Sequence, residues 1–84
     1  MNRVTVMLKK YRENSNIPIV QIDTNSIRYK YGNIDEVRLK NVPLDIPIIV
    51  RKKEDHYELI EGKHRLKKAR DEGRDTMLAK IWYK

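Results

Sequence analysis

Short apolar runs rich in β-branched residues, separated by polar turns, dominate the hydrophobic pattern of this chain. Runs of this length are too short for helices and predict β-strands. Pro18 lacks a backbone N–H, so the run that contains it should begin there or lie at a sheet edge. The predicted strands are residues 4–8, 17–22, 27–31, 47–51, 57–60 and 77–82.

One segment has a helical pattern instead. From Lys63 to Glu72 the residues are good helix formers throughout, and Gly73 can close the helix as a C-terminal cap. Leu66 and Ala69 share a face with Gly73 at helical spacing, so that face should contact the core. We therefore predict the main helix of the protein here, directly after a strand and a glycine.

A second, shorter helix is expected at residues 33–40. Asn33 and Glu36 resemble an N-cap and capping-box pair, and Pro43 would stop the helix. Val37 would then lie on its apolar side.

These elements predict an α+β fold, a small mixed β-sheet with one main helix after a strand-and-glycine turn. The runs at 47–51 and 57–60 are separated by a polar turn and should pair as a hairpin. The last strand can return beside the earlier ones through the helix, as a βαβ-type crossover. With 84 residues the chain allows one domain, residues 1–84, in which residues 1–16 could add a strand and a turn.

Composition and charge narrow the function. The net charge of +7 favours a polyanionic partner such as DNA, RNA, a nucleotide or an acidic protein. The chain contains no cysteine, which excludes disulfides, thiolate metal sites and a cysteine nucleophile. Its two histidines, His56 and His64, argue against a metal site built from protein ligands alone. No apolar run could cross a membrane or form a signal peptide, so a soluble, cytoplasmic protein is expected.

The most informative motif is the turn Gly62-Lys63-His64-Arg65, where a strand meets a glycine and a helix opens at once. Glycine permits a sharp turn and close approach of a ligand. The first N–H groups of a helix have no intrahelical partner and favour an anion. His64 and Arg65 add side-chain donors, and Arg65 can hold two phosphate oxygens at once. The same residues also fit an ordinary strand-to-helix turn whose basic side chains are solvated.

The chain resembles the ParB/sulfiredoxin superfamily mainly from Ile46 to Trp82, and residues 17–23 loosely resemble the first strand of that fold. The resemblance rests on the apolar strand that follows Pro47, the Tyr-Glu-Leu-Ile strand that begins at Tyr57 and the glycine-to-arginine turn. A helix with a small residue, a closing glycine and a final apolar strand complete it. The resemblance implies the ParB/sulfiredoxin-like fold for this chain.

In that family the glycine-to-arginine turn lies against nucleotide phosphates. ParB members bind and slowly hydrolyse CTP, and sulfiredoxins use a Gly-Cys-His-Arg turn with ATP. The resemblance therefore implies phosphate contacts at Gly62, Lys63, His64 and Arg65, with CTP or ATP and Mg as candidate cofactors. Lys63 stands at the cysteine position, which excludes sulfiredoxin chemistry because that reaction needs a thiolate.

A basic face on the main helix could extend the phosphate-binding surface and contact the backbone of a nucleic acid, with DNA as the first expectation. Basic residues recur at helical spacing from Lys63 onward, and residues 51 and 52 would extend the patch if the fold brings them close. Alternatively, the helix is simply solvated, and Asp71 and Glu72 offset part of its charge. The candidate nucleic-acid contacts are Lys67, Lys68, Arg70, Arg74, Arg51 and Lys52.

Two further functions stay open beside a binding module. The first is a minimal nuclease or nucleotide hydrolase. His64 and Arg65 would lie at the scissile phosphate, and Glu58 or Glu61 would bind a metal or water. The second is an adaptor whose basic face binds an acidic protein.

Aromatic residues on short strands are expected more often to pack in the core or at its rim than to stack on bases. Tyr29 and Tyr31, interleaved with Arg28 and Lys30, are the pair most expected to be exposed, where they could stack on bases.

Overall fold

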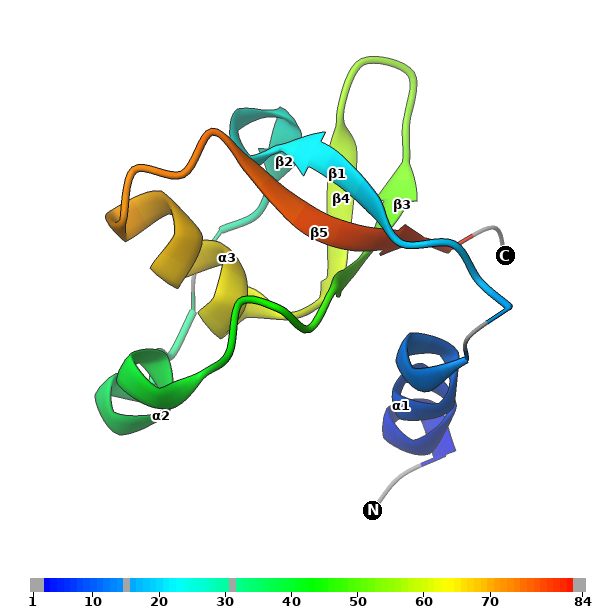
Figure 1. Cartoon of the computed structure of the whole chain (residues 1–84), viewed down its shortest axis with the longest axis horizontal. Coiled ribbons are helices and arrows are strands. Elements are labelled where there is room, and N and C mark those ends of the chain that lie inside the picture. Colours follow the sequence, from blue (N-terminus) through cyan, green and yellow to red (C-terminus); the bar gives the residue numbers. More distant parts are fainter. Residues whose placement is uncertain (1–2, 15, 31, 83–84) are drawn as a thin grey trace.

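The computed structural model of the chain describes residues 3–14, 16–30 and 32–82, with side chains from residue 8 onward. Five strands form one sheet in the order β1-β5-β3-β4-β2 (Figure 1). None of the helices within these described ranges is long and apolar enough to cross a membrane. The strands are β1 (Val20–Asp23), β2 (Ile27–Arg28), β3 (Ile48–Lys52), β4 (Tyr57–Glu61) and β5 (Thr76–Ile81). The helices are α1 (Arg3–Glu13), α2 (Glu36–Asn41), α3 (Lys63–Asp71) and the short 3-10 helix η1 (Thr24–Ser26).

The predicted α+β fold with a mixed sheet is confirmed. β3 and β4 pair antiparallel as the expected hairpin, and β5 lies parallel to β3, so α3 carries the crossover. β1 is the edge strand beyond β5 and begins at Val20, after Pro18, which leaves the proline outside the ladder. β2 pairs with β4 over two residues, and the Tyr31 end of the predicted strand lies outside the described residues.

The strand predicted at residues 4–8 is wrong, because these residues belong to α1. Figure 1 shows α1 beside the sheet, near the end of β5. Long-range contacts hold it there: the ring of Tyr11 lies 4.6 Å from that of Trp82, and the Tyr11 hydroxyl donates to the Ile81 carbonyl. Such tertiary contacts outweigh the strand propensity of the β-branched run.

Lys80 attaches α1 to the sheet from within the core. It lies on β5 with only 2% of its surface exposed. Its Nζ donates to the Asn14 carbonyl, 2.7 Å away and one residue past the end of α1. The helix dipole favours a cation at this end of a helix, so the buried ammonium group stabilises the docked position of α1.

α2 begins later than predicted. Asp35 caps it in place of Asn33, because the Asp35 Oδ1 accepts hydrogen bonds from the N–H groups of Val37 and Arg38 at 3.0 and 3.2 Å. The carboxylate lies one residue before the helix and can reach both donors. Val37 is 71% exposed, so the predicted apolar side of this helix is not formed there.

α3 ends one residue before the predicted boundary. Leu66 and Ala69 are fully buried against the sheet, as expected. Gly73 has a φ of 71° and follows the helix, but it is exposed and does not face the core. The core cluster consists of Ile22, Ile27, Ile48, Val50, Leu59, Leu66, Ala69, Met77 and Ala79.

Candidate phosphate-binding site

The turn between β4 and α3 requires glycine for two independent reasons. Gly62 adopts φ 115° and ψ 33°, a left-handed backbone conformation that is unfavourable for any L-residue with a Cβ atom. A Cβ atom at this position would lie 2.5 Å from Ile48 Cγ2 and 3.0 Å from Ile48 Cβ. The backbone conformation and the close packing on β3 together fix where α3 begins.

The start of α3 presents backbone donors. Within the described part of the chain no side chain caps this helix, and its first backbone bond runs from the Leu66 N–H to the Gly62 carbonyl at 3.0 Å. The N–H groups of Lys63, His64 and Arg65 precede that bond and have no intrahelical acceptor. They form the positive end of the helix dipole, where an anion is favoured.

A cavity of about 480 Å³ lies at this turn, and residues from β4, α2 and α3 line it. Its volume lies in the range of small-molecule sites, roughly 300–1,000 Å³. All four residues of the predicted motif, Gly62 to Arg65, line it. The apolar residues Tyr29, Val42, Pro43, Leu59 and Ile60 line it and are called its apolar wall; the cations Arg38, Lys63 and Arg65 and the imidazole of His64 line it as well.

Arg65 is held in place at the cavity wall. Only 11% of its side chain is exposed, its Nε donates to the Pro43 carbonyl at 3.1 Å, and its Nη1 lies 3.9 Å from Glu61 Oε1. Burial lowers the pKa of Arg65, and Glu61 acts in the opposite direction. A guanidinium group nevertheless remains charged in proteins. Arg65 is therefore a fixed positive charge beside the free amides.

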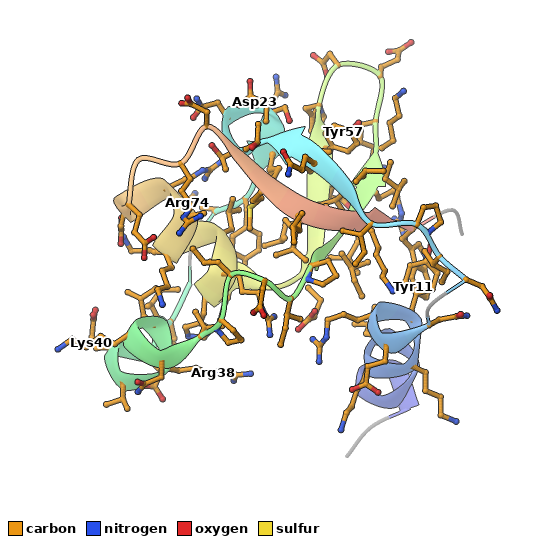
Figure 2. All side chains as sticks on the ribbon, viewed as in Figure 1. Tyr11, Asp23, Arg38, Lys40, Tyr57 and Arg74 are labelled. Carbon is orange, nitrogen blue, oxygen red and sulfur yellow. The ribbon has the colours of Figure 1, made fainter. Side chains whose placement is uncertain are left out.

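Two less constrained cations flank Arg65. Lys63 is half-buried at the first position of α3, and Arg38 is exposed on α2. Among the described residues, neither side chain forms an ion pair. Figure 2 shows Arg38 and Lys40 on different sides of α2. The sequence analysis missed Arg38, because its place at the cavity depends on how α2 packs against α3.

His64 lines the cavity but is directed at α2. It is 8% exposed, and its Nε2 accepts a hydrogen bond from the Asp35 N–H at 3.1 Å. Burial lowers the pKa of His64 below its ordinary value of 6.5, and the nearby Arg38, Lys63 and Arg65 lower it further, while Asp35 raises it. His64 is therefore neutral at pH 7, with its proton on Nδ1.

The two glutamates proposed for catalysis have different surroundings. Glu61 lies at the cavity, and its Oε1 pairs with Arg12 of α1 at 2.8 Å, which offsets the repulsion of an anion. Glu58 pairs instead with Arg51 at 3.7 Å and Lys53 at 4.0 Å on the β3–β4 hairpin. Within the described ranges, no three His, Cys, Asp or Glu side chains lie close enough together to hold a metal ion.

Two of the α3 residues predicted to contact nucleic acid, Lys68 and Arg70, donate hydrogen bonds to backbone carbonyls of the protein itself. Lys68 Nζ donates to the carbonyls of Lys40 and Val42 at 3.2 and 2.9 Å, and the Arg70 guanidinium donates to the carbonyls of Thr24 and Ile27. These two residues therefore hold neighbouring segments against α3.

The remaining cations of the predicted nucleic-acid face are more exposed. Lys67 pairs with Asp71 at 3.0 Å and Arg74 with Glu72 at 3.0 Å, so acidic neighbours offset their charges. Arg74 lies past the end of α3 (Figure 2). On β3, Lys52 is exposed. A nucleic-acid role for this set remains a prediction.

The tyrosine predicted to be exposed is partly buried. Tyr29 packs against the core cluster and lines the cavity, so it forms part of the apolar wall. Tyr31, which was predicted to be exposed together with Tyr29, lies outside the described residues, as does Tyr83. Tyr57 also packs against the core. Within the described ranges, these tyrosines contribute to packing.

The fold resembles two solved structures. One is "sulfiredoxin from Arabidopsis thaliana", with a TM-score of 0.66 and 24% identity over 80% of this chain and 86% of that one. The other is the "chromosome-partitioning protein ParB from Caulobacter crescentus complexed with CTP-gamma-S", C-terminally truncated, with a TM-score of 0.63 and 16% identity. That match covers 80% of this chain but 45% of the ParB chain. Both structures show that this chain has the fold that sulfiredoxin and ParB share.

The family follows from the sequence. The family model of the ParB N-terminal domain matches residues 1–83, and the chain therefore belongs to the ParB N-terminal domain family. The comparison with curated proteins found no match. The predicted superfamily and fold are thus confirmed, and the match extends beyond Ile46 to Trp82 into the first half of the chain.

Proposed function

We propose that this chain is a cytoplasmic nucleotide-binding module that holds the phosphates of CTP or ATP at the start of α3. The observation that carries the proposal is the cavity in which the free amides of residues 63–65 meet a fixed guanidinium group and two further cations. Each of these groups favours negative oxygen atoms. The family and the likeness to a CTP-γ-S complex of ParB support the same ligand class.

The parts of the cavity suggest separate roles. The amides, Lys63 and Arg65 would contact the phosphates, and Arg38 would approach them from α2. The apolar wall formed by Tyr29, Val42 and Leu59 offers a surface for the base or the ribose. Phosphate position would therefore come from charge and backbone donors, and base preference from the apolar side.

A magnesium ion accompanying the nucleotide would meet few acidic groups. Glu61 is the acidic residue among those that line the cavity, and its Oε1 already pairs with Arg12. Mg²⁺ is commonly held by one carboxylate together with phosphates and waters. Glu61 could serve as that carboxylate, with the ion neutralising charge on the phosphates.

We expect nucleotide binding to depend on Lys63 and not on overall charge. Lys63→Ala should weaken binding by about tenfold, because a charge-assisted contact to phosphate is lost. Lys67→Ala is the matched control, since it removes the same charge one turn later on α3, where Asp71 already pairs with it. Its affinity should stay within about twofold of the wild type.

Isothermal titration of CTP, ATP, GTP and UTP against the three proteins measures these effects. Saturable heat from CTP or ATP, with an affinity that falls in Lys63→Ala but not in Lys67→Ala, supports the proposal. Equal losses in both variants would mean that net charge alone attracts the ligand. No saturable heat from any of the four would contradict nucleotide binding.

DNA is the second candidate, supported by the net charge of +7. Binding along α3 should weaken steeply with salt, since each neutralised phosphate contributes about −0.9 to the slope of log K against log salt. Lys67→Ala and Arg74→Ala should then each reduce that slope by about one. A slope that neither substitution changes would exclude α3 as the DNA-binding face.

A further inference from the structure

Three side chains of α3 hold α2 through backbone atoms that flank it at both ends. At the beginning of α2, the Asp35 N–H donates to His64 Nε2 at 3.1 Å. At its end, Arg65 Nε donates to the Pro43 carbonyl at 3.1 Å, and Lys68 Nζ donates to the Val42 carbonyl at 2.9 Å. α2 has six residues, none of which is buried, and its Val37 is exposed. The side chains of α3 therefore set the position of α2.

In the His64 contact the acceptor is a ring nitrogen, so this contact depends on the protonation state of the imidazole. The imidazole accepts the Asp35 N–H, so Nε2 must carry no hydrogen. A protonated imidazole has two donors and no acceptor, and the Asp35 N–H would then face another N–H. Protonation of His64 would replace the hydrogen bond with a repulsive contact at the start of α2.

We propose that His64 is a positioning residue of the cavity: its neutral imidazole anchors the start of α2 and so places Arg38 where it meets the ligand. The inference rests on the proposed function and reassigns His64 within it. The motif resemblance suggested that His64 contacts phosphate directly. Its near-complete burial and its bond to the Asp35 amide favour the indirect role.

The charges that face His64 favour its neutral form. Arg38 approaches from α2, and Lys63 and Arg65 from α3, while Asp35 at the start of α2 acts in the opposite direction. Glu61 of β4 lies across the same cavity, where Arg12 and Arg65 neutralise it. Three cations and burial therefore outweigh the carboxylate of Asp35, which is itself engaged as the cap of α2.

The direction in which ligand affinity changes with pH distinguishes a positioning role of His64 from a direct contact of His64 with phosphate. The pKa of His64 is lowered in the folded protein, so the unfolded chain takes up the proton first as the pH falls. The stability from this residue is present above about pH 6.5 and is lost as the pH falls toward the folded pKa. A positioning role predicts that ligand binding weakens over the same range. A direct phosphate contact predicts the reverse, because protonation would add a positive charge.

Two substitutions test the inference. In His64→Gln the amide oxygen can replace Nε2 as acceptor without titrating, whereas His64→Leu fills the space and has no acceptor. At pH 7.5 we expect His64→Gln to bind CTP or ATP within about twofold of the wild type, and His64→Leu about fivefold more weakly. The ratio of wild-type to His64→Gln affinity should fall between pH 7.5 and 5, and this ratio cancels the titration of the nucleotide itself.

A second readout is independent of the ligand. Hydrogen exchange at the Asp35 amide, followed by NMR, should remain slow in the wild type and in His64→Gln and become fast in His64→Leu. Equal protection in all three proteins would overturn the inference, as would an affinity ratio that rises on acidification. If the wild type binds neither nucleotide, the proposed function fails, and the Asp35 amide alone then decides whether His64 anchors α2.

Discussion

Replacing Gly62 with alanine is expected to lower the free energy of unfolding by about 4 kcal/mol. Part of the loss comes from the left-handed backbone conformation, which costs an L-residue roughly 1–3 kcal/mol. The rest comes from the new Cβ, which would lie 2.5 Å from Ile48 Cγ2 and force β3 or α3 to move. Small domains have about 5–15 kcal/mol of stability, so the variant should be close to unfolding. Urea denaturation followed by circular dichroism measures the change.

Gly73→Ala is the matched control. Gly73 also has a positive φ, 71°, but a Cβ there would meet nothing within 4 Å. Only the conformational cost remains, roughly 1–2 kcal/mol. In an Ile48→Ala background the Gly62→Ala substitution should become less costly, because the contacting methyl group is gone. Equal losses for the two glycines would show that the contact with Ile48 contributes nothing.

Arg65→Ala is expected to weaken nucleotide binding by about 10- to 100-fold, the largest effect on affinity of any single substitution proposed here. A charged hydrogen bond contributes about 1.5–3 kcal/mol, and Arg65 is already held in position by Pro43 and Glu61. Little side-chain entropy is therefore lost when the ligand binds. Arg65→Lys should restore only part of the affinity, because lysine keeps the charge but not the planar pair of donors.

Arg65 also contributes to the fold, which the experiment must separate from binding. Removing it leaves the Pro43 carbonyl without this donor, so a loss of stability of about 1 kcal/mol should accompany the loss of affinity. Titration below the melting temperature of each variant, with folding verified by circular dichroism, keeps the two effects apart. An Arg65→Ala protein that is folded and binds like the wild type would exclude the guanidinium from the site.

The parts of the fold that the sequence could predict depend on local signals. The β-branched run of β3, the glycine at position 62 and the helix formers of α3 each specify their own conformation. α1 has no comparable signal. Its first residues favour a strand in isolation, and the contacts that make it a helix involve Tyr11, Lys80 and Trp82, residues that lie far apart in the sequence.

The candidate site shows the same division. The turn residues could be identified because a glycine followed by basic residues at a helix start has a local physical meaning. The sequence could not identify the hydrogen-bond partners of the basic residues. Sequence spacing placed Lys68 and Arg70 on a solvent-facing basic surface, whereas they donate to carbonyls of segments about 26 to 46 residues away. Arg38 reaches the cavity only because α2 is held against α3.

The most direct test of the account is a ¹H–¹⁵N NMR titration of the wild-type protein with CTP and, separately, with ATP. It reports on the backbone amides that are proposed to hold the phosphates. We expect the amide signals of Lys63, His64 and Arg65 to shift in a saturable way, while that of Gly73, at the other end of α3, stays in place. Shifts confined to the β3–β4 hairpin or the far end of α3, with the amides of residues 63–65 unmoved, would contradict the account.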